Sequence, residues 1–174
     1  MTLPTPSHPT GAQFSVSATA TIAAPAESVF SIILDLDSYS KWSTYASKAT
    51  RLSPSSFPLS VGDQIKFHVH LDKDKDGEDQ IDTISVLDRD GQVKRLSLVS
   101  SPFPTWILWV EKVQEVHPVE GDPSSCVIKL WISMGGSMGI MPSIVKGVVG
   151  KRLESRFKDY VNELKEYAER QTLQ

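Results

Sequence analysis

The sequence predicts an α+β domain in which a curved antiparallel sheet of six to seven strands wraps around a long C-terminal helix, with two short helices after the first strand. Three observations predict this fold. The length of 174 residues suits a single domain. Apolar and polar residues alternate with period two through the middle of the chain, and a helical period replaces this alternation near the C-terminus. The strands are consecutive, so short turns should join them into one sheet whose apolar face packs against the helix.

The two short helices are expected directly after the first strand. Residues 14–22 alternate small or apolar side chains with polar ones, which is a strand pattern. Pro25 then begins a helix, because a proline at the first helical position loses no hydrogen bond. This helix ends at residues 35–38, and residues 39–42 form a second helical turn.

The middle of the chain supplies the remaining strands of the sheet. The clearest of them covers residues 62–71. Its alternation places Ile65, Phe67 and Val69 on one face and polar residues on the other. The charged residues 72–79 form a loop after this strand. The strands predicted by the same alternation are residues 46–52, 62–71, 80–88, 93–99, 106–116 and 125–134.

A long helix is expected from about Pro142 to Arg170, after a glycine-rich junction at residues 135–139. It carries an apolar stripe and spans about 40 Å, which is enough to cross a sheet. A sheet that curves around such a helix cannot close tightly along its whole length, and the remaining gap becomes a small-molecule cavity. Residues 1–13, rich in Pro, Thr and Ser, are expected to form a flexible arm, and residues 14–174 a single domain.

Composition excludes several classes of function. The net charge of −3 gives no electrostatic reason to bind nucleic acid or an anionic membrane surface. No apolar run approaches the roughly 18 residues of a membrane-spanning helix, and the N-terminus lacks the pattern of a secretory signal. Cys126 is the only cysteine, which fits a reducing compartment. We therefore expect a cytoplasmic protein with no nucleic-acid partner and no stable membrane insertion.

The opening of the domain resembles a known superfamily. It carries the pattern Ile22-x-Ala24-Pro25-x-x-x-Val29-Phe30, then Asp35, then Tyr39-x-x-Trp42. This opening resembles the START/birch-allergen (SRPBCC) superfamily, and in particular its polyketide cyclase/dehydrase-like branch. Gly62 followed by an alternating strand resembles the third strand of that family. Phe157, Tyr160 and Leu164 resemble the end of its terminal helix, so the similarity runs from about residue 14 to 170.

The resemblance implies the helix-grip fold and an internal cavity for hydrophobic ligand binding. It implies less about chemistry, because the superfamily includes lipid carriers, hormone receptors, co-chaperones, polyketide cyclases and dehydratases, and a shared fold does not settle function. No catalytic motif common to the family can be carried over to residues of this chain.

The cavity walls can be assigned from the strand and helix patterns. Inward-facing positions of two strands and of the last helix are expected to bind the ligand, and these are Ile65, Phe67, Val69, Ile128, Leu130, Ile132 and Val148. Met134, Met138 and Met141 cluster at the junction, where their thioethers adapt to an irregular ligand or else fill the core. Tyr39 and Trp42 either pack at the sheet edge or line the mouth of the cavity.

Glu111 is the first candidate for an acid–base residue. Trp109 and Glu111 share one face of a predicted strand. If that face points inward, Trp109 shapes the pocket, and the Glu111 carboxyl has a raised pKa and exchanges protons near pH 7. The opposite face, which carries Val110 and Val116, is nearly as apolar, so a Glu111 on the outer face or at the rim is the alternative. Tyr39 is the second catalytic candidate.

Three motifs suggest ion or nucleotide binding without completing a site. Residues 72–77 resemble the start of a calcium loop, yet Thr83 stands where a bidentate Glu is required. His68 and His70 share a strand face, but no third zinc ligand is evident. Residues 135–139 match neither glycine-rich phosphate-binding motif. We therefore expect neither a metal nor an organic cofactor.

These observations predict a protein that binds an apolar small molecule in an internal cavity. The first hypothesis is catalysis in secondary-metabolite biosynthesis, by cyclisation, dehydration or isomerisation of a polyketide- or terpenoid-type intermediate. Cavity shape and one acid or base suffice for such steps. The second hypothesis is a non-catalytic carrier or sensor of a lipid-like ligand, with no ionisable group facing inward. The third is a co-chaperone or other protein-binding module, which needs an exposed apolar groove.

Overall fold

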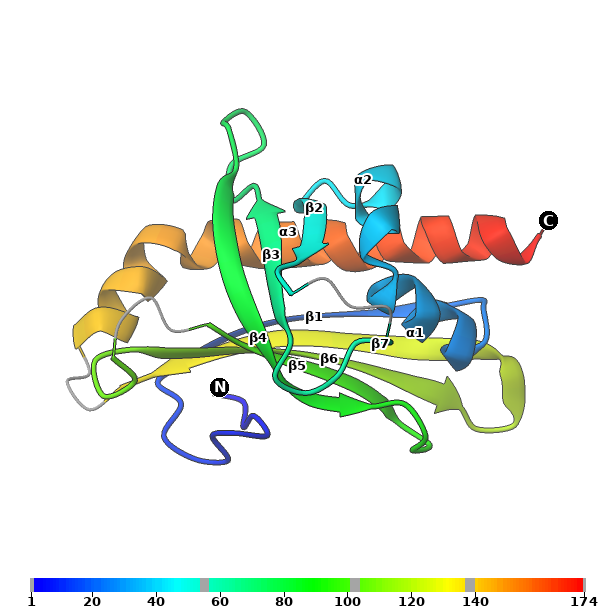
Figure 1. Ribbon diagram of the computed structural model, residues 1–174, viewed down its shortest axis with the longest axis horizontal. Coiled ribbons are helices and arrows are strands. Elements are labelled where there is room, and N and C mark those ends of the chain that lie inside the picture. Colours follow the sequence, from blue (N-terminus) through cyan, green and yellow to red (C-terminus); the bar gives the residue numbers. More distant parts are fainter. Residues whose placement is uncertain (1, 54–56, 101–103, 137–139, 174) are drawn as a thin grey trace.

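A strongly curved antiparallel sheet organises the protein (Figure 1). The computed structural model describes residues 2–53, 57–100, 104–136 and 140–173, except the side chains of residues 140–146, 148 and 149. In this described part the sheet has seven strands in the order β1-β7-β6-β5-β4-β3-β2. The strands are β1 (Phe14–Ile22), β2 (Ala46–Arg51), β3 (Gln64–Val69), β4 (Glu78–Asp88), β5 (Lys94–Ser100), β6 (Trp109–Val119) and β7 (Asp122–Gly135).

One long helix lies along one side of this sheet. It is α3 (Ile140–Thr172), which has 33 residues and runs behind the sheet in the view of Figure 1. The shorter elements α1 (Ala26–Leu34), η1 (Leu36–Ser38) and α2 (Tyr39–Trp42) follow β1, and α1 and α2 both contact α3. No helix in the described ranges is long and apolar enough to cross a membrane. The fold predicted from the sequence is confirmed in its strands, its long helix and its short helices.

The apolar stripe of α3 packs into the concave side of the sheet. Its buried members are Leu153, Phe157, Tyr160, Val161, Leu164 and Ala168. The Phe157 side chain is fully buried, and burying a side chain of this size contributes about 1.5–3 kcal/mol. Since the helix faces only one side of the sheet, the strands have an inner face toward α3 and an outer face away from it.

The strand register tells which side chains belong to each face. The Tyr160 hydroxyl of α3 donates a hydrogen bond to Gln114 of β6, so Gln114 is on the inner face. Gln114 is paired with Leu130, and residues two apart along a strand share a face. Lys112 and Ile132 are therefore inner residues as well, while Glu111 and its partner Ser133 are outer residues.

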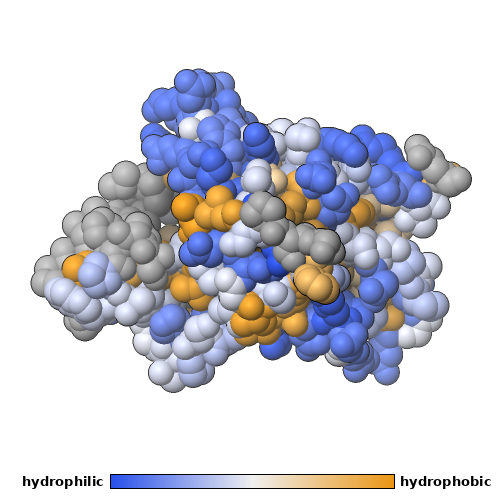
Figure 2. Space-filling view, viewed as in Figure 1, coloured by the Kyte–Doolittle hydropathy of each residue, from blue (hydrophilic) through white to orange (hydrophobic). Residues whose placement is uncertain are grey.

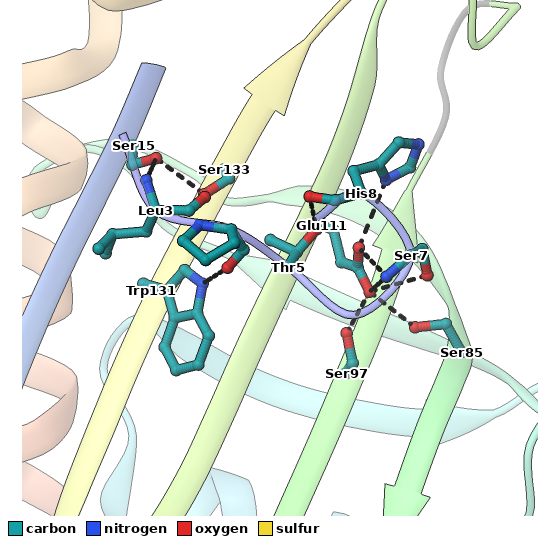
Figure 3. Close-up of polar contacts among 11 residues, drawn as sticks. Leu3, Thr5, Ser7, His8, Ser15, Ser85, Ser97, Glu111, Trp131 and Ser133 are labelled. Carbon is teal, nitrogen blue, oxygen red and sulfur yellow. Dashed lines mark hydrogen bonds and ion pairs between the residues drawn. The ribbon is translucent and has the colours of Figure 1, made fainter. Parts of the chain in front are cut away.

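The N-terminal arm, described from residue 2 to residue 13, crosses the outer face of the sheet before β1 begins. In Figure 3 its first residues pass over β7 and β6, with Leu3, Thr5, Ser7 and His8 turned toward the strands. The Trp131 indole N–H donates a hydrogen bond to the Pro4 carbonyl at 3.0 Å, which is one of several contacts that hold the arm there. The composition of the arm had suggested only a flexible segment.

Candidate functional site

The inner face of the sheet contains a chain of hydrogen-bonded polar groups. Tyr39 comes from α2, Tyr160 from α3 and Gln114 from β6. The Tyr160 hydroxyl donates to Gln114 Oε1 at 2.7 Å and lies 3.3 Å from the Tyr39 hydroxyl, which bonds to the Ile33 carbonyl at 3.0 Å. All three side chains are almost completely buried. Three separate elements therefore converge on one polar spot in the core.

Burial reinforces the protonated state of the two phenols. It raises the pKa of Tyr39 to about 12, because an apolar environment disfavours the phenolate. Burial also raises the pKa of Tyr160 well above its ordinary value, and the neighbouring Tyr39 adds to this effect. Both hydroxyls are consequently protonated at neutral pH. Neither is a phenolate base, and each already donates its single proton, Tyr160 to Gln114 and Tyr39 to the Ile33 carbonyl.

A buried ion pair lies beside these hydroxyls. Lys112 Nζ is 3.3 Å from Asp82 Oδ2, and the two side chains are only 9% and 1% exposed. The ammonium also lies 4.5 Å from the centre of the Phe67 ring, and the Gln80 amide donates to the other Asp82 oxygen at 2.6 Å. The desolvation cost of two buried charges can exceed the energy of their attraction, so this pair is weak evidence for a stabilising role.

Four of these polar side chains, those of Tyr39, Tyr160, Gln114 and Lys112, border a small cavity. Its lining residues are Tyr39, Tyr45, Ala46, Phe67, Lys112, Gln114, Leu130 and Tyr160. Its volume is about 10 Å³, which is room for about one water molecule. The cavity is this small because aromatic rings fill the space around it: Trp42 lies 5.0 Å from both Tyr39 and Tyr160, measured between ring centres. A ligand larger than water can enter only if some of these rings move.

Most of the apolar positions assigned to the cavity walls are buried on the inner face. These are Ile65, Phe67, Val69, Ile128, Leu130, Ile132 and Met134. Phe67 and Leu130 border the small cavity, and Trp42 packs against the tyrosines that line it. Their part in ligand binding stays a prediction. Met138 lies outside the described residues, and so do the side chains of Met141 and Val148.

The sequence left both parities of β6 open, and the structure shows the one in which Glu111 and Trp109 face away from the cavity, which corrects the pocket-lining place considered for them. The strand register places both side chains on the outer face. Figure 3 shows Glu111 there, in contact with the arm. Glu111 is fully buried there. It accepts hydrogen bonds from Ser97 Oγ at 2.5 Å, from Ser85 Oγ at 3.1 Å and from the Ser7 backbone N–H at 3.1 Å. Both faces of β6 are apolar enough to be buried, so alternation alone could not decide between them.

The raised pKa expected of a cavity-facing Glu111 does not apply on the outer face. Burial raises the pKa of this carboxyl, but the hydroxyl donors Ser97, Thr5, Ser7 and Ser85 together outweigh burial and hold the pKa below its ordinary value. Glu111 is therefore an ionised carboxylate held by neutral donors. Its location removes the premise on which a catalytic role was assigned to it.

The residues that the sequence analysis missed are Lys112, Gln114 and Asp82. Lys112 and Gln114 lie between Val110 and Val116 on the inner face of β6, so half of these four inner residues are polar. Polar residues inside an otherwise apolar face were the available signal. Tyr160 was recognised in the helix stripe, but the need of its buried hydroxyl for a partner was not considered.

His68 of β3 and His70, which directly follows β3, both bond to neighbouring side chains. His68 Nδ1 lies 2.8 Å from Asp79, and His70 Nε2 lies 2.8 Å from Ser47 Oγ. Within the described ranges, no three side chains of His, Cys, Asp or Glu converge on a point that could hold a metal ion.

Comparison with known proteins identifies the family. Residues 13–169 match the family described as polyketide cyclase / dehydrase and lipid transport. The chain belongs to this family. The inner face, the long helix and the short helices between β1 and β2 are therefore the elements of a START/SRPBCC superfamily member.

The individual relatives described here share only a small part of their sequence with this chain. Oxopyrrolidines biosynthesis cluster protein O of Penicillium oxalicum is 26% identical over 172 residues, which cover 87% of this chain and 85% of that protein. The ZhuI aromatase/cyclase of Streptomyces sp. R1128 shares the fold, with a TM-score of 0.67 and 17% identity over 91% of this chain and 95% of its own. A START superfamily protein of Mycobacterium smegmatis gives a TM-score of 0.64 and 17% identity, over 90% of this chain and 98% of its own.

Proposed function

We propose that this family member binds an apolar, carbonyl-bearing intermediate of polyketide type between the sheet and α3, and promotes its cyclisation or dehydration. The observation that carries the proposal is the Lys112–Asp82 pair beside the Tyr39 and Tyr160 hydroxyls in an aromatic interior. The family description supports it, and so does the relative named for a biosynthesis cluster. The ZhuI aromatase/cyclase supports the fold only.

The polar groups suit the chemistry of a ketone substrate. Cyclisation of a polyketone begins when a base removes a proton beside a carbonyl, and negative charge then develops on the carbonyl oxygen. The Lys112 ammonium is a donor for that oxygen. The Tyr39 and Tyr160 hydroxyls become donors to it when the ligand displaces their present acceptors, the Ile33 carbonyl and Gln114. Such interactions are stronger in this interior than in water. Asp82, at 3.3 Å from Lys112, is the candidate base. The alkoxide formed by ring closure takes the proton back before water is lost.

A substrate needs more room than the cavity of about 10 Å³ provides. The four-residue helix α2 carries Tyr39 and Trp42, and such a short helix moves at lower cost than the sheet or α3. We therefore expect α2 to shift when a ligand enters, opening the space that its two aromatic side chains occupy.

The test uses a short poly-β-ketone thioester as the substrate surrogate, with cyclised and dehydrated products measured by liquid chromatography and mass spectrometry. Wild-type protein is expected to form them at least 10-fold faster than heat-denatured protein. Lys112→Met should lower the rate by about 10²-fold, and Tyr160→Phe by about 10-fold. Glu154→Gln, at an exposed position of α3, is the matched control and should leave the rate unchanged. Equal rates in wild type and Tyr160→Phe, with both proteins folded, contradict the proposal.

The second candidate is a non-catalytic carrier of a lipid-like ligand. It is favoured by the largely apolar inner face, where Ile65, Phe67 and Leu130 are all buried. In the same experiment a carrier would bind the surrogate stoichiometrically, as seen by native mass spectrometry, without accelerating product formation. The two candidates therefore give different results with one substrate.

A further inference from the structure

The outer face of the sheet binds the backbone of the arm through side chains. Ser133 Oγ donates to the Leu3 carbonyl at 2.7 Å, and the Leu3 N–H donates to Ser15 Oγ at 2.9 Å. The Trp131 indole N–H donates to the Pro4 carbonyl at 3.0 Å. In these contacts, side chains of the sheet form hydrogen bonds with backbone groups of the arm, as the side chains of a peptide-binding groove do with a bound peptide. The arm forms no strand ladder with the sheet here.

A second set of contacts holds the turn that follows. Residues 5–8 form a β-turn closed by reciprocal backbone hydrogen bonds between Thr5 and His8, at 3.1 and 3.2 Å. Pro6 occupies the position of this turn that proline favours. At the tip, the Ser7 N–H and hydroxyl both donate to Glu111, at 3.1 and 3.0 Å. The turn thus presents two donors to one buried carboxylate.

An aromatic contact completes the docked arm. The His8 ring stacks on the Trp109 ring, with centres 3.9 Å apart and planes at 3°. The Thr5 side chain is almost fully buried, and Val113 beneath this part of the outer face is fully buried. Figure 3 shows the donors and acceptors of the sheet turned toward the arm from β1, β7, β6, β5 and β4. The outer face therefore binds the arm through three kinds of contact: hydrogen bonds to its backbone, hydrogen bonds to the Glu111 carboxylate and the stacked His8 ring.

This surface continues past the point where the arm leaves it. Ser85, which shares Glu111 with Ser7, also borders an open groove on the outer face. The other residues that line this groove are Gln64, Ile81, Thr83 and Val99. The arm must turn back at residues 9–13 to reach β1, so it cannot follow the groove. A segment from another molecule has no such constraint.

We propose that the outer face is a peptide-recognition surface for a proline-rich segment with a Pro-Ser β-turn, and that the arm is its resident ligand. The external partner is a protein that presents such a segment, displaces residues 3–8 and continues along the groove beside Ser85. This proposal concerns the face of the sheet opposite the interior. It does not depend on the proposed function.

The experiment measures binding of a fluorescein-labelled peptide with the sequence of residues 1–10 by fluorescence anisotropy. The receptor is the full chain carrying Ser7→Pro, which removes the N–H and the hydroxyl that hold the arm on Glu111. The peptide is expected to bind this variant saturably, and wild-type protein at least 10-fold more weakly, because the resident arm competes. No binding to a folded Ser7→Pro protein, or equal binding to both proteins, overturns the proposal.

Two further variants in the Ser7→Pro background locate the bound peptide. Trp131→Phe keeps an aromatic ring but loses the donor to the peptide carbonyl, and it should weaken binding by at least 5-fold. Thr19→Ala is the matched control, because Thr19 is an exposed outer residue of β1 that is paired with Lys129 and not with Trp131. It should leave the affinity unchanged. An equal effect of the two substitutions, with circular dichroism showing both proteins folded, means that the peptide binds elsewhere and overturns the proposal.

Discussion

Two buried carboxylates, Asp82 on the inner face of the sheet and Glu111 on the outer face, are satisfied in opposite ways. The Asp82 carboxylate is paired with a positive charge, because the Lys112 ammonium lies 3.3 Å from it. Glu111 is surrounded by neutral donors, of which the nearest is Ser97 Oγ at 2.5 Å. His8 Nδ1, at 3.4 Å, is the titratable group nearest to Glu111 on the arm. A carboxylate can therefore be buried in this fold either by a counter-charge or by several hydrogen bonds.

The difference matters because losing a partner destabilises the protein in a different way in each arrangement. An ion pair depends on one partner, so loss of that partner leaves an uncompensated charge in the core. A network of hydroxyls and an N–H loses one donor at a time, and each loss costs about as much as one hydrogen bond to a charged group. Part of the Glu111 network comes from the arm, so this carboxylate also depends on a segment outside the sheet.

The largest effect is expected for the inner carboxylate. Lys112→Met should lower the free energy of unfolding by about 3–5 kcal/mol at pH 7, because Asp82 is left buried and unpaired. Adding Asp82→Leu should recover most of this loss, since no isolated charge remains. Urea unfolding followed by circular dichroism measures both variants. A loss below about 1 kcal/mol for Lys112→Met would mean that Asp82 reaches water and is not dependent on the pair.

The outer carboxylate should be less sensitive. Glu111→Gln keeps the size of the side chain but replaces an ionised acceptor with a neutral amide, and it should cost about 2 kcal/mol. Urea unfolding at pH 7 gives this value. If Glu111→Gln is as destabilising as Lys112→Met, the claim that the outer carboxylate is less sensitive than the inner one is wrong.

The pH dependence of the same variant sharpens the comparison. The pKa of Glu111 in the folded protein lies below the ordinary value of 4.5, so the folded state favours the ionised form. Its contribution to stability is fully present above that ordinary value and is lost as the pH falls through the lower, folded pKa. The stability difference between wild type and Glu111→Gln should therefore shrink between pH 5 and pH 3. A difference that stays constant or grows on acidification contradicts the lowered pKa.

A smaller effect is expected for the neutral hydrogen bond on the inner face. Tyr160→Phe removes the hydroxyl that donates to Gln114 at 2.7 Å, while the ring and its packing remain. The free energy of unfolding should fall by about 1 kcal/mol. Thermal unfolding measures it, with Phe157→Ala as a variant that should lose about 3–5 kcal/mol by leaving a cavity in the same helix stripe. Similar losses for the two variants would indicate that the Tyr160 ring also repacks.

The smallest effect belongs to the surface of α3. Glu154→Gln removes an exposed ion pair with Lys158 one helical turn away. Solvent and salt screen such pairs, so no measurable change in melting temperature is expected. A clear decrease in the melting temperature would show that the exposed pair couples to the packing of the helix.

Much of the fold followed from periodicity in the sequence. The alternation around Ile65, Phe67 and Val69 assigned the inner face of β3, and the stripe through Phe157 and Leu164 assigned the buried side of α3. These segments have one clearly apolar side, so only one orientation removes it from water. The resemblance at residues 21–42 then led to the correct family.

The candidate site was less predictable for a physical reason. In β6 both sides carry apolar and polar residues, and both sides are buried: one by α3 and the other in part by the arm. Alternation distinguishes buried from exposed faces, and it cannot distinguish two buried faces. The arm itself gives no periodic signal, because its docking depends on side chains such as Trp131 and Glu111 that are distant in the sequence.

Strand β6 has a consequence for how this protein can evolve. Selection should act differently on its successive residues, because Lys112 borders the interior cavity while Glu111 accepts hydrogen bonds from the arm. A deletion of one residue before this pair would exchange the two faces at once, so single-residue deletions there should be lost from populations. Substitution rates among relatives should instead vary with a period of two along the strand, because one set of alternate residues packs in the interior and the other set contacts the arm.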